Sequence, residues 1–199
     1  HRQLPEGDQH EQPLGPERLA AYDRAIQEGE RLGICCWMLL SSGDPLELLS
    51  LVERHPDSAF LLFCRPEEIT AAVLDEVAPL YHLMPVVRWE DGTGEACARL
   101  RDARLPYSVC CSYAQQDLQS LLSGDLFCDT QQLHPLFTVL AARPDCPADV
   151  RRLAYQAAVR ARSGQYYQTV PWELSCDARN LDEIISNDGC CVFFDGQGR

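Results

Sequence analysis

Continuous apolar runs alternate with amphipathic segments along most of the chain. The runs at 34–40, 59–64 and 83–89 are bounded by turn residues, a pattern typical of strands buried on both faces of a parallel sheet. Between them, apolar residues recur at helical spacing, as in the segment that Pro16 opens and Gly33 closes. Strands and helices that alternate over short connections predict an α/β fold. About six such units fit a partial (β/α)6 TIM-like barrel, or an open parallel sheet flanked by helices, better than a complete barrel.

The pattern is less regular in the second half of the chain. The remaining expected elements are strands at 106–113, 126–128, 136–140, 166–172 and 190–194, and helices at 115–122, 148–162 and 180–185. Residues 1–14 are polar and show no periodicity, which predicts a flexible leader. The expected organisation is therefore this leader followed by a single β/α domain over residues 15–199.

The charge of the chain restricts its partners. A formal net charge of -13 and a pI near 4.7 make the protein strongly acidic, which argues against nucleic acid or an anionic membrane as partner. No apolar run approaches the length of a membrane span and no signal peptide is recognisable, so we expect a cytoplasmic protein. All 17 basic residues are Arg, so lysine Schiff-base chemistry is excluded within this chain.

The 11 cysteines are scattered through apolar stretches without C-x-x-C or zinc-ribbon spacing. Six of them form three adjacent pairs, each inside a strand-like run, so one thiol of each pair should face the core and the other a helix layer. We expect reduced thiols that pack as small apolar side chains. His55, His82 and His134 share no zinc-ligand spacing with each other or with a cysteine, and we predict no metal site.

A turn of small residues follows the first apolar run. Ser42, Gly43, Asp44 and Pro45 lie where a strand ends and a helix begins, the place where open α/β sheets and barrels bind ligands. Gly43 allows close backbone approach to a ligand or a positive φ. The same residues also suit a tight connection that caps the next helix, since Asp followed by Pro often starts one. Both interpretations remain open at this point.

A second group of polar residues follows the run at 83–89. Glu90 and Asp91 are adjacent carboxylates at a strand end and are candidates for acid–base work, although solvated loop charges have the same pattern. Arg88 lies within the apolar run itself, where an unpaired guanidinium is costly, so we expect it to pair with Asp44 or Glu90.

Four segments, in this order, resemble radical S-adenosylmethionine (radical SAM) enzymes of the bacterial branch whose catalytic domain is a partial (β/α)6 barrel. They are 30–34 leading into 42–45, then 55–63, 85–90 and 105–113. The resemblance implies that Ser42, Gly43, Asp44 and Pro45 correspond to the family's Gly-Gly-Glu-Pro motif, whose backbone receives the methionine end of S-adenosylmethionine. It also implies that Glu90 is the acidic residue near the bound nucleoside.

The chain departs from the family at the positions that carry chemistry. The family holds a [4Fe–4S] cluster with C-x-x-x-C-x-x-C upstream of the helix that Pro16 opens here, and residues 1–15 contain no cysteine. The expected Thr-Asn-Gly after the second strand is replaced by Cys64, Arg65 and Pro66. The residues therefore suggest no catalytic group and no metal ligand, and no cofactor is assigned with certainty.

Three functional hypotheses follow. The first is a degenerate radical-SAM-like domain without its own cluster motif, a non-catalytic binding or scaffolding protein with a protein partner or a small molecule at the carboxyl ends of its strands. The second is a fragment of an active radical SAM iron–sulfur enzyme whose cluster-binding loop lies upstream of His1, with S-adenosylmethionine and [4Fe–4S] as cofactors. The third is an unrelated cytosolic α/β protein that binds a small ligand.

Overall fold

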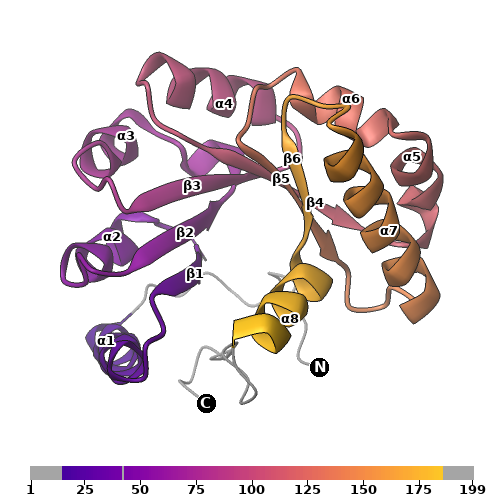
Figure 1. The fold of residues 1–199 in the computed structure, drawn as a ribbon. Helices are drawn as coiled ribbons and strands as arrows, with labels where there is room; N and C mark the ends of the chain where they lie inside the picture. The colour runs from indigo at the N-terminus through magenta and orange to yellow at the C-terminus, as the bar shows by residue number, and fades with distance from the viewer. Residues whose placement is uncertain (1–14, 42, 186–199) are drawn as a thin grey trace. The chain divides into compact units, whose positions relative to one another are not determined.

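The computed structural model describes residues 15–41 and 43–185. These residues form two compact units, one reaching to Leu105 and the other beginning at Pro106. Each unit consists of three parallel strands with their connecting helices (Figure 1). No helix within the described ranges is both long and apolar enough to cross a membrane.

The first unit is a run of β/α repeats. Its elements are α1 (Pro16–Arg31), β1 (Cys36–Leu40), α2 (Leu46–Glu53), β2 (Ala59–Cys64), the 3-10 turn η1 (Pro66–Glu68), α3 (Ala71–Val77), β3 (Leu83–Arg88) and α4 (Thr93–Asp102). Its strands follow each other across the sheet in chain order, β1-β2-β3. Short connections allow this order because each helix returns the chain to start the next parallel strand.

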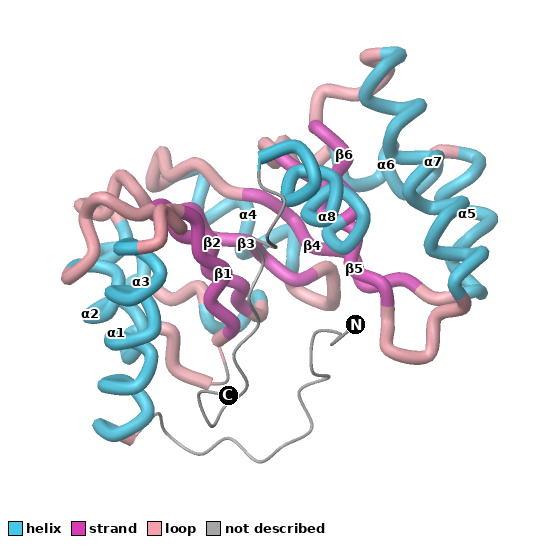
Figure 2. Tube along the Cα trace, turned by 60° about the horizontal axis from the view of Figure 1, so that its bottom comes forward, coloured by secondary structure: helices cyan, strands magenta, loops and turns pink. Residues whose placement is uncertain are grey.

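The register of the first unit assigns its side chains to two faces. Leu40, Phe63 and Val86 stand side by side in one row, and Arg88, two residues after Val86, continues that face at the strand end. Trp37, of the opposite parity, lies against α1: a Cβ on Gly29 would clash with the Trp37 ring. The Arg88 face is therefore the one turned away from α1, and Figure 2 shows α1, α2 and α3 together on one side of the strands.

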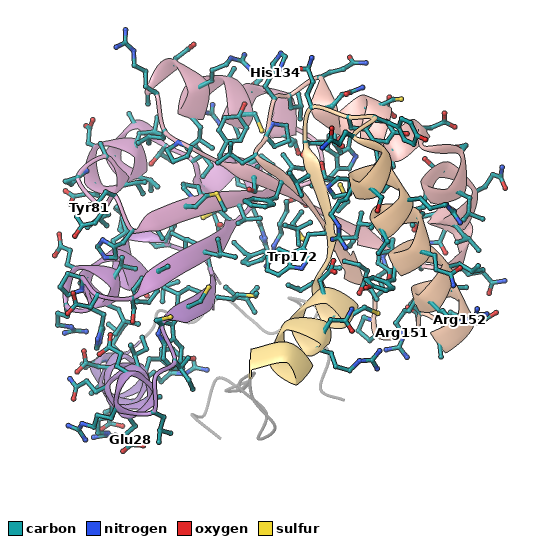
Figure 3. All side chains as sticks on the ribbon, viewed as in Figure 1. Glu28, Tyr81, His134, Arg151, Arg152 and Trp172 are labelled. Atoms are coloured by element: carbon teal, nitrogen blue, oxygen red, sulfur yellow. The ribbon has the colours of Figure 1, made fainter. Side chains whose placement is uncertain are left out.

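The second unit repeats the arrangement. Its elements are β4 (Ser108–Tyr113), the 3-10 turn η2 (Gln115–Asp117), α5 (Leu118–Ser123), α6 (Asp125–Gln131), β5 (Phe137–Ala142), α7 (Ala148–Gly164), β6 (Val170–Glu173) and α8 (Leu174–Ile185). Its strand order is β4-β5-β6, again parallel. Trp172 points to the side of β6 away from α7 (Figure 3) and packs against Phe137 with ring centroids 6.4 Å apart.

The structure confirms the predicted α/β fold of parallel strands flanked by helices and corrects several elements. The candidate strand at 126–128 is wrong: these residues belong to α6, which starts after Gly124 adopts φ +87°, and three apolar residues carry no period that separates helix from strand. The last helix begins at Leu174 rather than at 180, and β6 begins at Val170 rather than at 166. The expected leader at 1–14 and strand at 190–194 lie outside the described residues.

Candidate functional site

The carboxyl ends of β1, β2 and β3 lie at one edge of the first unit, because the strands are parallel and adjacent. Three connections start there: 41–45 leads into α2, 65–70 into α3 and 89–92 into α4. Side chains on such connections are positioned by a rigid scaffold but are not committed to its core. Both regions in which the sequence predicts a site lie on these connections.

The turn after β1 contains the predicted ligand-binding residues. Ser42 lies outside the described residues; Gly43 and Asp44 are exposed, and Pro45 is buried. The backbone N–H of Leu46, the first residue of α2, donates to Asp44 Oδ1 over 2.9 Å, so Asp44 holds the start of this helix from just before its N-cap, Pro45. A Cβ on Gly43 would have no atom within 4 Å, and its φ is +155°. The turn is thus open to a ligand from outside, and its role in binding remains a prediction.

The turn after β3 carries the two predicted carboxylates at the surface, and of the two Asp91 lines a cavity. Glu90 and Asp91 are both exposed. The Thr93 hydroxyl holds the turn: it donates to the carbonyl of Arg88 and accepts from the N–H of Glu90, over 2.8 and 2.9 Å. The structure therefore offers a well-held turn with solvated acids, and acid–base work by Glu90 remains untested.

Arg88 does not make the ion pair that the sequence predicts. No ion pair or hydrogen bond joins it to Asp44 or Glu90, and no other described residue pairs with it directly. The carboxylate whose charge it influences is Glu68, the last residue of η1. Its guanidinium is half-buried on the face turned away from α1, at the same edge as the Gly43 turn. The expected pairing is wrong because Asp44 is committed to α2 and Glu90 is turned to solvent.

Glu68 is the site residue that sequence reasoning missed. It is 8% exposed and accepts two hydrogen bonds, from Ser41 Oγ to Oε1 over 3.1 Å and from the Arg65 N–H to Oε2 over 2.7 Å. Burial raises the pKa of this carboxyl despite both hydrogen bonds and the nearby Arg88 and Arg65 charges, which lower it. In the sequence, Pro66, Glu67 and Glu68 look like an ordinary exposed helix start, so no local signal distinguishes Glu68.

A cavity of about 390 Å³ adjoins this edge between η1 and α4. Its lining includes Glu67, Asp91 and Glu95, with Arg99 as the basic member. The Arg99 guanidinium donates to the carbonyl of Pro66 over 3.2 Å. Three carboxylates against one tethered guanidinium make this cavity unsuited to an anionic group, in contrast to the surroundings of Arg88.

The second unit holds a buried carboxylate of its own. Glu173, at the end of β6, is fully buried and accepts from Tyr113 Oη over 2.9 Å and from the Cys176 N–H over 2.6 Å. Burial, followed by the Glu173 charge, raises the pKa of Tyr113. Arg162 pairs with the neighbouring Asp177 through two contacts of 2.6 and 2.9 Å. Every one of these groups has a partner, so the cluster is a structural network.

The described cysteines do not fit an iron–sulfur cluster. Such a cluster needs several thiolates converging from one loop, and among the side chains described in 15–41 and 43–180 no three from cysteine, histidine or acidic residues gather around a metal position. Cys110 and Cys111 are both buried, on opposite faces of β4 as alternation requires, whereas Cys35 and Cys36 are both exposed. The expectation of one core thiol per pair therefore fails for Cys35 and Cys36.

Comparison with known proteins bears on the fold. Two structures of SuiB from Streptococcus suis, one of them bound to S-adenosylmethionine, each superpose on 90% of this chain with a TM-score of 0.59. The sequence identities are 12% and 13%, and the match covers 48% and 47% of the SuiB chains, so this chain spans about half their length. No protein-family model and no curated protein sequence matches the chain. At these identities the likeness concerns the fold alone: this chain shares with SuiB an arrangement of parallel strands flanked by helices.

Proposed function

We propose that this chain is a radical-SAM-like domain that binds a small molecule of the S-adenosylmethionine class at the carboxyl ends of β1–β3. It acts as a binding or scaffolding module and catalyses no reaction through its own residues. The observation that carries the proposal is Arg88, a half-buried guanidinium without a direct partner among the described residues, on the same edge as the open Gly43 turn.

The chemistry of this edge suits an amphiphilic ligand with a carboxylate. Below Arg88 the same face of the strands is apolar, with Leu40, Met84 and Leu61 only half-buried. An unpaired, partly desolvated guanidinium favours a carboxylate, which it can hold through two parallel N–H···O bonds. The backbone of Gly43 lies open beside it for the polar end of the ligand. S-adenosylmethionine combines such a carboxylate with a base that can pack on apolar side chains.

The non-catalytic part of the proposal rests on what the site residues do. The described cysteines do not converge on a common metal position. Glu90 and Asp91 are solvated, and Glu68 is committed to two hydrogen bonds. We expect the module to act beside a protein partner rather than on nucleic acid or an anionic membrane, because its net charge of -13 disfavours both of the latter.

Calorimetric titration tests the proposal directly. The chain is titrated with S-adenosylmethionine and, separately, with adenosine, which lacks the carboxylate. We expect saturable binding of S-adenosylmethionine, weakened at least about tenfold by Arg88→Gln, since a charge-assisted bidentate contact is worth about 1.5–3 kcal/mol. Adenosine should bind weakly and equally to both proteins.

Arg152→Gln is the matched control, because Arg152 is exposed on α7 of the other unit (Figure 3) and should leave binding unchanged. Equal affinity of the Arg88→Gln variant and the unchanged protein would exclude Arg88 as the carboxylate partner. Absence of any saturable binding would overturn the proposal.

A second candidate is a catalytic role within a longer protein. The observation that favours it is the match to SuiB, which covers nearly all of this chain and under half of the solved structures. Anaerobic reconstitution of the longer protein with iron and sulfide separates the candidates, because the catalytic candidate has its cluster-binding loop upstream of His1. A thiolate–iron charge-transfer band near roughly 400 nm would support the catalytic candidate, whereas a binding module should show S-adenosylmethionine binding without the band.

A further inference from the structure

Glu68 joins the ends of two strands through side-chain hydrogen bonds. It projects from η1, after β2, and its Oε1 accepts from the hydroxyl of Ser41, the residue that follows β1. Its Oε2 accepts from the N–H of Arg65, at the start of the β2 connection. Both side chains are buried, Ser41 at 4% and Glu68 at 8% exposed. A carboxylate in such a place is costly unless it is hydrogen-bonded, so its presence calls for a reason.

The Ser41 hydroxyl also contacts the backbone of the Gly43 turn, the connection at 41–45. The N–H of Gly43 approaches Ser41 Oγ at 3.5 Å, a long hydrogen bond. An ionised carboxylate only accepts, so the Ser41 hydrogen must point at Glu68, which leaves the oxygen lone pairs directed at Gly43. The backbone N–H of Ser41 meanwhile donates to the carbonyl of Phe63 over 3.0 Å. The start of the turn is thereby held from both its backbone and its side chain.

We propose that Glu68 is the positioning residue of the Gly43 turn. The hydrogen bond that it accepts from Ser41 orders the turn for its ligand. The hydrogen bond that it accepts from Arg65 holds Glu68 at the end of β2. This inference deepens the proposed function and rests on it for the ligand. A pre-ordered turn binds more tightly because the ordering has been completed before the ligand arrives. Glu68 itself lies under the turn and need not touch the ligand.

Amide hydrogen exchange on the ligand-free chain tests the ordering, and titration with S-adenosylmethionine tests its consequence. Glu68→Gln keeps the size of the side chain but offers a single acceptor oxygen. We expect amide exchange to become about tenfold faster at Arg65 and roughly twofold faster at Gly43. These two values are the ends of the range expected when one net hydrogen bond is lost. The dissociation constant for S-adenosylmethionine should rise by roughly two- to tenfold.

Two further variants make the result specific. Glu67→Gln is the matched control. The carboxylate of Glu67 is next to Glu68 in the sequence, is exposed and lies 3.9 Å from the Arg65 guanidinium. Its loss should not change amide exchange at Gly43. Ser41→Ala should speed exchange at Gly43 as Glu68→Gln does, and the double variant should add nothing, because both act through one chain of bonds. Exchange at Val86, in the core of β3, reports any general loosening.

The outcomes separate the two proposals. Unchanged exchange at Gly43 in Glu68→Gln, or equal acceleration at Gly43 and Val86, would overturn the positioning role. Faster exchange at Gly43 with no binding of S-adenosylmethionine by any of the proteins would refute the proposed function, while Glu68 would still order the turn. Faster exchange with unchanged affinity would show that the order imposed by Glu68 is not used by the ligand.

Discussion

The charged residues at the carboxyl ends of β1–β3 differ chiefly in how far their side chains are removed from water. Glu90 and Asp91 keep their charges in water, whereas Arg88 and Glu68 are partly or largely removed from it. Desolvation favours the neutral form of a carboxyl group, and for Glu68 this effect exceeds the combined influence of its hydrogen bonds and the nearby Arg88 and Arg65. The pKa of Glu68 is therefore higher in the folded chain than in the unfolded one.

This shift makes a prediction for stability against pH. In the unfolded chain a glutamate has a pKa of about 4.3, so between that pH and the raised folded pKa the native state retains a proton that the unfolded state has released. The stabilisation due to protonated Glu68 is fully present below the unfolded pKa and is lost as pH rises through the folded pKa. Relative to the unchanged protein, Glu68→Gln should therefore gain stability as pH rises through this window.

Urea unfolding at a series of pH values from about 4 to 7 measures this difference. Taking the difference between the two proteins removes the contributions of other carboxylates. The titratable groups that interact with Glu68 are Cys64, Arg65 and Arg88, and none of them has an ordinary pKa within the window. A difference in unfolding free energy that stays flat over the window would contradict the raised pKa.

At the scale of elements, α1 is attached to the first unit through a buried histidine. His55, 3% exposed, lies after α2 and places Nδ1 3.1 Å from Glu30 Oε1 and Nε2 3.3 Å from Asp23 Oδ1, both carboxylates of α1. Ser58 adds a hydrogen bond of 2.7 Å to Glu30 and accepts one from Trp37. The attachment is thus polar as well as apolar.

Replacing His55 should loosen α1. We expect His55→Gln to lower the free energy of unfolding by about 1–3 kcal/mol, because the ring contacts to both carboxylates are lost, and to expose α1 to limited proteolysis. Asp57→Asn, an exposed change in the same connection, is the control. Unchanged cleavage within 16–31 after His55→Gln would show that apolar contacts alone hold the helix.

The last helix, α8, begins at another buried polar network. Glu173 accepts the N–H of Cys176 in the first turn of α8, as an N-terminal cap does, and Asp177 accepts the N–H of Glu173 in return. Tyr113 of β4 supplies the second donor to Glu173. The side chain of Glu173 therefore ties a strand end, a helix start and a neighbouring strand together.

Tyr113→Phe tests this network with the smallest change. The variant keeps the ring but leaves the buried Glu173 carboxylate with one donor fewer, so the free energy of unfolding should fall by about 1–3 kcal/mol. Tyr155→Phe, which removes a hydroxyl bonded to Asn180 over 2.6 Å at a half-buried position, should cost less. Equal losses in the two variants would mean that burial of Glu173 adds nothing to the strength of the contact.

Across the whole molecule, the cysteines differ in how far their thiols are exposed to solvent. Among the described residues, Cys35, Cys36 and Cys128 are exposed, and Cys176 is half-buried. Five are buried: Cys64, Cys97, Cys110, Cys111 and Cys146. Burial raises the pKa of Cys97 to about 11 and that of Cys176 to about 12, the latter with help from the Glu173 charge. The thiolate is the reactive form, so these thiols should react slowly.

Thiol labelling of the native chain at pH 8, followed by peptide mass spectrometry, checks this distribution. Cys35, Cys36 and Cys128 should be modified first, and Cys64 and Cys97 only at the rate of unfolding. Labelling in urea provides the reference in which all thiols react. Rapid modification of Cys97 in the native chain would contradict its burial against β3.

The sequence by itself determined the α/β class, the place of most elements and the two turns at which polar residues gather. Local patterns suffice for these features, because strand, helix and turn each impose a period or a residue type on a few consecutive positions. The contact of Asp44 with the start of α2 belongs to the same class: its partner, Leu46, is two residues away. The assignment of 126–128 failed where a run was too short to show any period.

Only the tertiary structure decided which residues meet. The link from Glu68 to Ser41 spans 27 positions, that from Glu173 to Tyr113 spans 60, and that from His55 to Glu30 spans 25. None of these carboxylates differs in its local sequence from an exposed surface acid. Burial and pairing depend on which strands become neighbours and in what register, and that is a property of the whole chain rather than of any segment. For the same reason the charge of Arg88 influences Glu68 instead of pairing with the acids that its position in the sequence suggests.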